Sequence, residues 1–225
     1  MPEYLTLTLR GSPYDMGHQH GQQARNLRPQ ILAAMEARFL RLEDEKPDDA
    51  FEFLLAGTRA VLEKWDAPLL ATIRGQADAL SIDYEAMLRY DLVSYLGDDL
   101  RVRRLVGSQG CTTWAASGVA TDGGQAILAK NRDYDLDHLP LQVVVRAEPE
   151  GGFPYLYVTS AGSPGIYCAG MNAAGLAVAD THVYSRDLGP GLPSFSLMLH
   201  VLQEHSHVSS ALDYLRSVPR LGRNN

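Results

Sequence analysis

The residues of this sequence best suited to chemistry are Gly110 and Cys111, which stand side by side in the run Ser108-Gln109-Gly110-Cys111. Gly110 has no Cβ, so its carbonyl can be approached closely and its backbone can adopt a strained conformation. The Cys111 thiol is therefore placed to attack that carbonyl and to move the Gly110 acyl group from nitrogen to sulfur. Release of the acyl group by water would leave a new N-terminus at Cys111.

A new N-terminus at Cys111 would supply a base as well as a nucleophile. A free α-amine has a pKa of roughly 7.7–8.0, so part of it is unprotonated near neutral pH. It can then accept the proton of a thiol whose pKa is about 8.5. The alternative for Cys111 is a buried structural cysteine, the commonest fate of a free thiol.

Polar residues at the end of a predicted strand accompany the candidate nucleophile. Two β-prone segments joined by a glycine-rich turn follow Cys111 and predict a hairpin. Period-two geometry puts Asn131 and Asp133 on one face of the returning strand, and Lys130 and Arg132 on the other. Without a catalytic role, Asp133 would be a solvated carboxylate and Asn131 a turn-forming residue.

The motifs around Cys111 resemble those of the cysteine N-terminal-nucleophile hydrolases. The resemblance rests on Gly110-Cys111-Thr112-Thr113, on Asn131-x-Asp133, and on residues 170–178, Gly-Met-Asn-Ala-Ala-Gly-Leu-Ala-Val. The most similar branch is the penicillin acyltransferase-like autoproteolytic branch, peptidase family C45, and the bile-salt and penicillin V hydrolases are more distantly similar. An internal Cys111 behind a long leader fits the autoproteolytic branch, and residues 11–21 of that leader also resemble it.

The resemblance implies roles for several further residues. Asp133 would hold the α-amine of Cys111, with Asn131 nearby as a hydrogen-bond partner. His182 stands where the bile-salt branch places an oxyanion-hole Asn, and a neutral imidazole N–H could donate to a developing oxyanion. Thr181 could do so equally, and His182 could instead be a core histidine. Lys130 aligns with an Arg of the bile-salt branch.

Hydrophobic patterning predicts an α+β fold. Alternation predicts a strand at residues 4–9, and apolar residues every three or four positions predict helices at 14–42, 51–65, 68–80 and 84–96, the last capped by Asp83 and ended by Gly97. Strands are predicted at 111–117, 125–134, 141–148, 155–160, 165–169 and 176–184, and helices at 194–205 and 210–218. Short turns between strands indicate an antiparallel arrangement. The resemblance implies an antiparallel αββα sandwich of the N-terminal-nucleophile hydrolase type with a mostly helical leader.

The predicted nucleophile divides the chain into two parts. Residues 1–110 form a leader, and residues 111–225 begin the nucleophile-bearing chain. Gly97 is the expected hinge, and the charged residues 98–104 are expected to form a surface linker that exposes the bond before Cys111. Related sequences continue beyond Asn225, so we expect a C-terminally incomplete chain, a separate remainder or a shortened relative.

Composition excludes several classes of protein. The sequence is 45% hydrophobic and 21% charged, which is ordinary for a globular chain, and its net charge of −7 makes nucleic acid or an anionic membrane an unfavourable partner. The Met1-Pro2-Glu3-Tyr4 start has no signal-peptide character, and we expect a cytoplasmic protein. Two cysteines are too few for a disulfide scaffold or a thiolate zinc site. His18 and His20 are expected on a polar helix face rather than at a metal.

The expected function is that of a self-processing cysteine amidohydrolase or acyltransferase. It would act on a small-molecule amide or acyl donor through a thioester, need no metal or organic cofactor, and keep its cleaved leader bound. Its oligomeric state is open. One alternative is a papain-like protease, because Gln109-Gly-Cys-x-x-Trp114 is superficially similar to that motif. Another is an uncleaved, inactive scaffold that binds partners.

Overall fold

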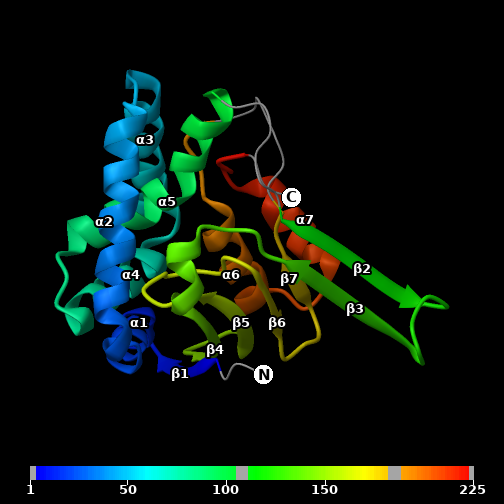
Figure 1. The fold of residues 1–225 in the computed structure, drawn as a ribbon. Helices are drawn as coiled ribbons and strands as arrows, with labels where there is room; N and C mark the ends of the chain where they lie inside the picture. Colours follow the sequence, from blue (N-terminus) through cyan, green and yellow to red (C-terminus); the bar gives the residue numbers. More distant parts are fainter. Residues whose placement is uncertain (1–3, 105–110, 182–188, 223–225) are drawn as a thin grey trace.

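The structure is a computed structural model that describes residues 4–104, 111–181 and 189–222. Figure 1 shows a layer of helices from the N-terminal half beside a sheet, further helices near the C-terminus, and a ribbon of paired strands that projects from the body. The fold is α+β. No helix in the described part of the chain is both long enough and apolar enough to cross a membrane.

The leader consists of one strand and a group of helices. In chain order these are β1 (Leu5–Gly11), α1 (Pro13–Gln23), the 3-10 helix η1 (Arg25–Leu27), α2 (Arg28–Glu45), α3 (Asp49–Trp65), α4 (Ala67–Leu80) and α5 (Tyr84–Arg104). Side-chain caps begin several helices, and the cap at Asp83 is the one predicted from the sequence. Asp48 accepts a hydrogen bond from the N–H of Phe51, and Asp83 accepts one from the N–H of Ala86.

Two helix boundaries differ from the sequence-based expectation. The single helix expected at residues 14–42 is divided into α1 and α2, because Pro29 lacks the N–H that would bond one turn back. Gly97 does not end the last leader helix, since α5 continues to Arg104 and residues 98–104 are helical rather than an irregular linker. A glycine inside a helix costs only about 1 kcal/mol relative to alanine, which the surrounding helix tolerates.

The remaining elements form the β-rich half. They are β2 (Thr112–Gly118), β3 (Gly124–Asn131), the 3-10 helix η2 (Leu136–Leu141), β4 (Gln142–Pro149), β5 (Tyr155–Ser160), β6 (Ala169–Asn172), β7 (Ala177–Ala179), α6 (Ser194–Glu204) and α7 (Val208–Ser217). The strand expected at 165–169 is absent, and its place is taken by turns and the start of β6. Gly162, with φ of +83°, and the following Pro164 favour turns over a continuous strand.

The main sheet has five strands in the order β1-β4-β5-β6-β7, and β2 with β3 forms a separate two-stranded sheet. β1 pairs with β4 in parallel, from Leu5 opposite Val143 to Gly11 opposite Pro149, whereas the other pairs are antiparallel. The expectation of a wholly antiparallel arrangement is therefore wrong at this edge. The helices α1 to α5 and the β2–β3 hairpin lie between β1 and β4 in the chain, and a long connection permits parallel pairing.

The leader and the β-rich half share one hydrophobic core. Leu7 and Leu9 of β1 point into it beside Val143 and Val145 of β4, and all four side chains are buried. Residues of α1–α5 and of α6 belong to the same cluster. The leader is thus a structural part of this fold, since burial of a side chain of this size contributes about 1.5–3 kcal/mol.

Candidate active site

Cys111 lies directly before β2 and is partly buried. Its carbonyl oxygen accepts a hydrogen bond of 3.0 Å from the hydroxyl of Thr181, which follows β7. Gly110, the other predicted partner in self-cleavage, lies outside the described residues, as does His182. The end of β7 is therefore anchored to the residue that carries the candidate nucleophile.

The register of the hairpin decides which of its side chains share a face. β2 and β3 are antiparallel, with Thr113 opposite Lys130. Residues opposite each other in a ladder lie on the same face, and this face alternates along each strand. Thr113 and Lys130 consequently belong to one face of the hairpin, and Asn131 belongs to the other. Cys111 and Arg132 lie just beyond the paired residues.

A buried ion pair occupies the face that Thr113 and Lys130 share. The Lys130 side chain is 2% exposed, and its ammonium contacts both the carboxylate and the backbone carbonyl of Asp180. The second carboxylate oxygen of Asp180 accepts a hydrogen bond of 3.1 Å from Ser194, and its carbonyl accepts one of 3.0 Å from Thr113. Asp180 thus joins β2, β3 and the first residue of α6.

Asn131 and Asp133 are both exposed. β3 ends at Asn131, so Asp133 follows the strand rather than lying within it as the predicted strand 125–134 has it. Within the described part of the chain no hydrogen bond to either side chain occurs. Their catalytic roles stay predictions, and the charged groups that the structure pairs beside Thr113 are Lys130 and Asp180 instead.

The second cysteine lies close to the same charged groups. Burial raises the pKa of the Cys168 thiol, while Lys130 and Arg132 act in the opposite direction. Asp180 and Cys111 also influence the Cys168 pKa, which places all five residues in one electrostatic neighbourhood. A thiol with a raised pKa is a poor nucleophile at neutral pH, so Cys168 suits an inert structural role.

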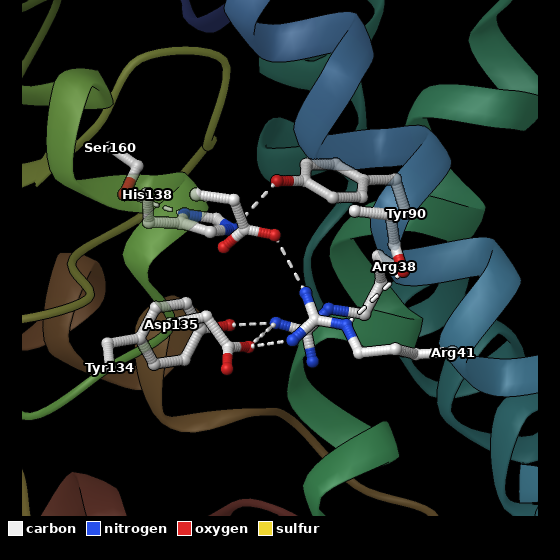
Figure 2. Close-up of polar contacts among 9 residues, drawn as sticks. Arg38, Arg41, Tyr90, Tyr134, Asp135, His138 and Ser160 are labelled. Carbon is white, nitrogen blue, oxygen red and sulfur yellow. Dashed lines mark hydrogen bonds and ion pairs between the residues drawn. The ribbon is translucent and has the colours of Figure 1, made fainter.

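A chain of buried hydrogen bonds leads from Arg132 into the leader. The guanidinium of Arg132 donates to the Ser160 hydroxyl at 3.2 Å, and this hydroxyl lies 3.1 Å from Nδ1 of His138. Nε2 of His138 is 3.1 Å from the hydroxyl of Tyr90 on α5, as Figure 2 shows. Burial, aided by Arg132 and Arg38, lowers the pKa of His138 to about 3, so its imidazole is neutral.

Two arginines of α2 hold the segment after β3. Arg38, whose side chain is 3% exposed, donates to the Tyr134 hydroxyl at 2.7 Å and contacts Asp135 at 3.0 Å. Arg41 contacts Asp135 and Asp137, each at 2.7 Å. Figure 2 shows both guanidinium groups facing this segment. The leader thereby fixes the stretch that connects β3 to β4.

Asp180 and the network around His138 were not predicted from the sequence. Asp180 and Thr181 follow an apolar strand, and polar residues at a strand end near a predicted nucleophile are a signal that could have singled them out. Arg38, Tyr90 and His138 gave no such signal, because each belongs to a different element. Only folding brings them together.

His20 also departs from the expectation of a polar helix face. It is 1% exposed, and its Nε2 accepts a hydrogen bond of 3.0 Å from the N–H of Gly162. Burial lowers its pKa to about 4, so the neutral ring is a packed core residue. Among the described residues no group of three or more His, Cys, Asp or Glu side chains is arranged to hold a metal ion.

Comparison with known families bears directly on this half of the chain. Residues 119–225 match the model of the family described as acyl-coenzyme A:6-aminopenicillanic acid acyl-transferase. The match supports a relationship of this part of the chain to that acyltransferase family. It also supports an enzymatic role of the acyltransferase or hydrolase type. It includes Lys130, Asp133 and Asp180 and begins after Cys111. A search of curated proteins gave no match.

Proposed function

We propose that this chain is a self-processing cysteine amidohydrolase or acyltransferase of the penicillin acyltransferase-like branch, with Cys111 as its nucleophile. The family match over residues 119–225 carries the proposal. The site supports it, because Cys111 is partly buried directly before strand β2 and its carbonyl accepts a hydrogen bond from Thr181.

In the first step the Cys111 sulfur attacks the Gly110 carbonyl carbon. The carbon–sulfur bond forms, the Gly110–Cys111 carbon–nitrogen bond breaks, and the departing nitrogen takes up the thiol proton. Water then hydrolyses the thioester, which gives a leader that ends in the Gly110 carboxylate and a chain that begins with Cys111. The thiol is regenerated next to a free α-amine.

In the second step the Cys111 thiolate attacks the carbonyl of a small-molecule amide or acyl donor. A thioester forms, the amine leaves with a proton from the α-amine, and the acyl group passes to water or to an acceptor amine. Asp133 would orient the α-amine, with Asn131 beside it, and His182 or Thr181 would donate to the oxyanion. Thr181 already contacts the Cys111 backbone. No metal or organic cofactor is required by this route.

Residues 1–110 would remain bound to residues 111–225 after cleavage. β1 supplies an edge strand to the main sheet through its parallel ladder with β4. Arg38 and Arg41 pair with Asp135 and Asp137 across the same division. Separation of the two pieces would expose the shared core and leave these charges unpaired, and both changes are unfavourable. We extend the proposal to the αββα sandwich and a cytoplasmic location.

The two alternatives differ from this proposal in testable ways. A papain-like cysteine opens a long helix, whereas Cys111 precedes strand β2, which argues against a papain-like site. An inactive scaffold would remain a single uncleaved chain. Intact mass therefore separates the scaffold from the processed enzyme.

The decisive experiment follows the mass of the purified chain with time. We expect a fragment that ends at Gly110 and a fragment that begins at Cys111, identified by N-terminal sequencing. Cys111→Ala should remain whole, whereas Cys168→Ala, the matched control, should be cleaved like the wild type. A folded wild-type chain that includes any downstream residues and stays intact would refute self-processing.

A further inference from the structure

Strand β1 forms one edge of the main sheet, and a row of its backbone groups points away from the sheet. Successive residues of a strand direct their N–H and C=O groups to alternate edges. The ladder with β4 lies on the inner edge, and the groups of Thr8 and Arg10 face outward. Outward N–H and C=O groups of an edge strand are a template for pairing with another chain.

Two glutamines of α1 occupy these outward groups. The side-chain oxygen of Gln23 accepts a hydrogen bond of 3.0 Å from the N–H of Thr8, and its amide nitrogen donates one of 2.8 Å to the Thr8 carbonyl. Gln19 makes the same two bonds to Arg10, at 2.9 and 2.8 Å. Each glutamine thus pairs with one residue of β1 as a neighbouring strand would, because a primary amide carries both a donor and an acceptor.

The spacing of the two glutamines fits the spacing of the strand. Residues four apart in an α-helix share a face and lie about 6 Å apart along its axis. Residues two apart in a strand point to the same edge and lie about 6.6 Å apart. The earlier glutamine bonds to the later strand residue and the later glutamine to the earlier one, because α1 runs antiparallel to β1. Helix and strand can therefore bond at two successive positions.

Close packing against α4 holds α1 in the place that this pairing needs. A Cβ on Gly21 would lie 2.9 Å from the carbonyl oxygen of Gln76, and one on Gly17 would lie closer still to the carbonyl oxygen of Thr72. Both positions therefore require glycine if the two helices are to stay this close. These glycines belong to residues 11–21, a stretch of the leader to which the proposed chemistry gives no role.

We infer that the outer edge of β1 is a pairing surface for β1 of a second copy of this chain, and that Gln19 and Gln23 keep this surface occupied. The sequence of β1 suits such a pair, because it alternates leucine with threonine and carries a single charge, at Arg10. In an antiparallel pair with Thr8 opposite its own copy, Arg10 lies opposite Thr6, so like charges do not meet. β1 contains no lysine or proline, the residues that protect many natural edge strands.

The test is the oligomeric state of Gln19→Ala/Gln23→Ala, measured by sedimentation velocity at increasing protein concentration. Alanine removes both amides and preserves the helix, because it has the highest helix propensity. We expect a concentration-dependent dimer that the wild type does not form at the same concentrations. At low concentration the amide hydrogens of Thr8 and Arg10 should exchange about tenfold faster than in the wild type.

The matched control is Gln22→Ala. Gln22 is an exposed glutamine of the same helix, and within the described residues its side chain makes no hydrogen bond. Its substitution should leave both the sedimentation and the exchange of the Thr8 and Arg10 amides as in the wild type. Thermal melting checks that each variant is folded.

A proline distinguishes pairing through β1 from general aggregation. Thr8→Pro removes an outward N–H, and an edge strand tolerates proline at such a position. Added to Gln19→Ala/Gln23→Ala, it should return the sedimentation to that of the wild type, because the second copy then loses a hydrogen-bond donor at the centre of the pair.

Two results would overturn the inference. One is a folded double variant that sediments like the wild type at every concentration. The other is association that persists after Thr8→Pro is added, because pairing through β1 would then not be its cause. Should the double variant not fold, the single variants Gln19→Ala and Gln23→Ala decide in the same way, since each frees one residue of the edge. These results do not depend on cleavage at Gly110, so they leave the proposed function untouched.

Discussion

Two polar clusters join the leader to the β-rich half, and they differ in the charge of their buried histidine. In the first, His138 lies among Arg38, Arg132 and the hydroxyls of Tyr90 and Ser160, and its pKa falls to about 3. In the second, His200 of α6 lies between carboxylates. The same residue type is thus neutral in one cluster and protonated in the other, because its neighbours carry opposite charges.

The second cluster is built around Asp66, which caps α4 and is 2% exposed. Asp66 accepts a hydrogen bond of 2.5 Å from Ser196 and contacts Nε2 of His200 at 3.2 Å, while Glu204 lies 2.9 Å from Nδ1. Burial alone would lower the pKa of His200, but its hydrogen bonds to Asp66 and Glu204 raise it to about 10. His200 is therefore a part of the interface between the leader and the β-rich half.

Because one histidine is neutral and the other is protonated, the two clusters respond to pH in opposite directions. The first holds the two halves together through arginines that never lose their charge, and protonation of His138 would oppose them. The second depends on a proton that His200 keeps up to a pKa of about 10. Three substitutions test this comparison, from the largest expected effect to the smallest.

The largest effect is expected for Arg38→Met. This change removes a buried guanidinium from Asp135 and from the Tyr134 hydroxyl. We expect the free energy of unfolding to fall by about 3 kcal/mol, the lower end for removal of one partner of a buried pair, since Arg41 still contacts Asp135. Urea denaturation measures the change.

The control for Arg38→Met is an exposed pair with the same chemistry. Arg10 contacts Glu148 at 3.0 Å, and their side chains are 67% and 51% exposed. Arg10→Met should change the free energy of unfolding by less than about 1 kcal/mol, because water screens such pairs. Equal effects of the two substitutions would mean that the first cluster does not hold the halves together.

A smaller effect is expected for the alkaline response of His200. Its pKa in the folded protein lies above its ordinary value of 6.5, so its contribution is complete below pH 6.5 and is lost as the pH rises toward about 10. We expect this loss to be about 2 kcal/mol in the wild type and absent in His200→Gln. Denaturant unfolding at several pH values between 6.5 and 10 would show it. Parallel pH curves for the two proteins would contradict a charged His200.

The smallest effect is expected for the acidic response of His138. Its folded pKa of about 3 lies below the ordinary 6.5, so the unfolded chain binds the proton more readily and stability falls as the pH drops from 6.5 toward 3. His138→Gln keeps a donor and an acceptor at this position and should reduce that slope by about 1 kcal/mol over the range. The quantity to compare is the difference in slope between the wild type and His138→Gln, because carboxylates titrate in both proteins and contribute equally to both slopes. An unchanged slope would show that His138 is not held neutral.

The sequence by itself determined most of the local structure. Alternation predicted β1, and the capping residue Asp83 predicted the start of α5, because both signals act between residues close in the chain. Period two correctly separated Asn131 from Lys130 on β3. The cysteine flanked by glycine and threonine, and its family resemblance, were also available from residue order alone.

Only the tertiary structure decided which face of strand β3 is covered by other residues. Lys130 is buried because Asp180, fifty residues later, lies against it, and no local pattern records a partner at that distance. The parallel pairing of β1 with β4 has the same origin, since the helices between them must first pack to bring the strands together. Tyr90 meets His138, and Arg38 meets Tyr134, for this reason as well. Charge and burial at a site depend on what the fold places around each residue, and the sequence of one segment does not contain that information.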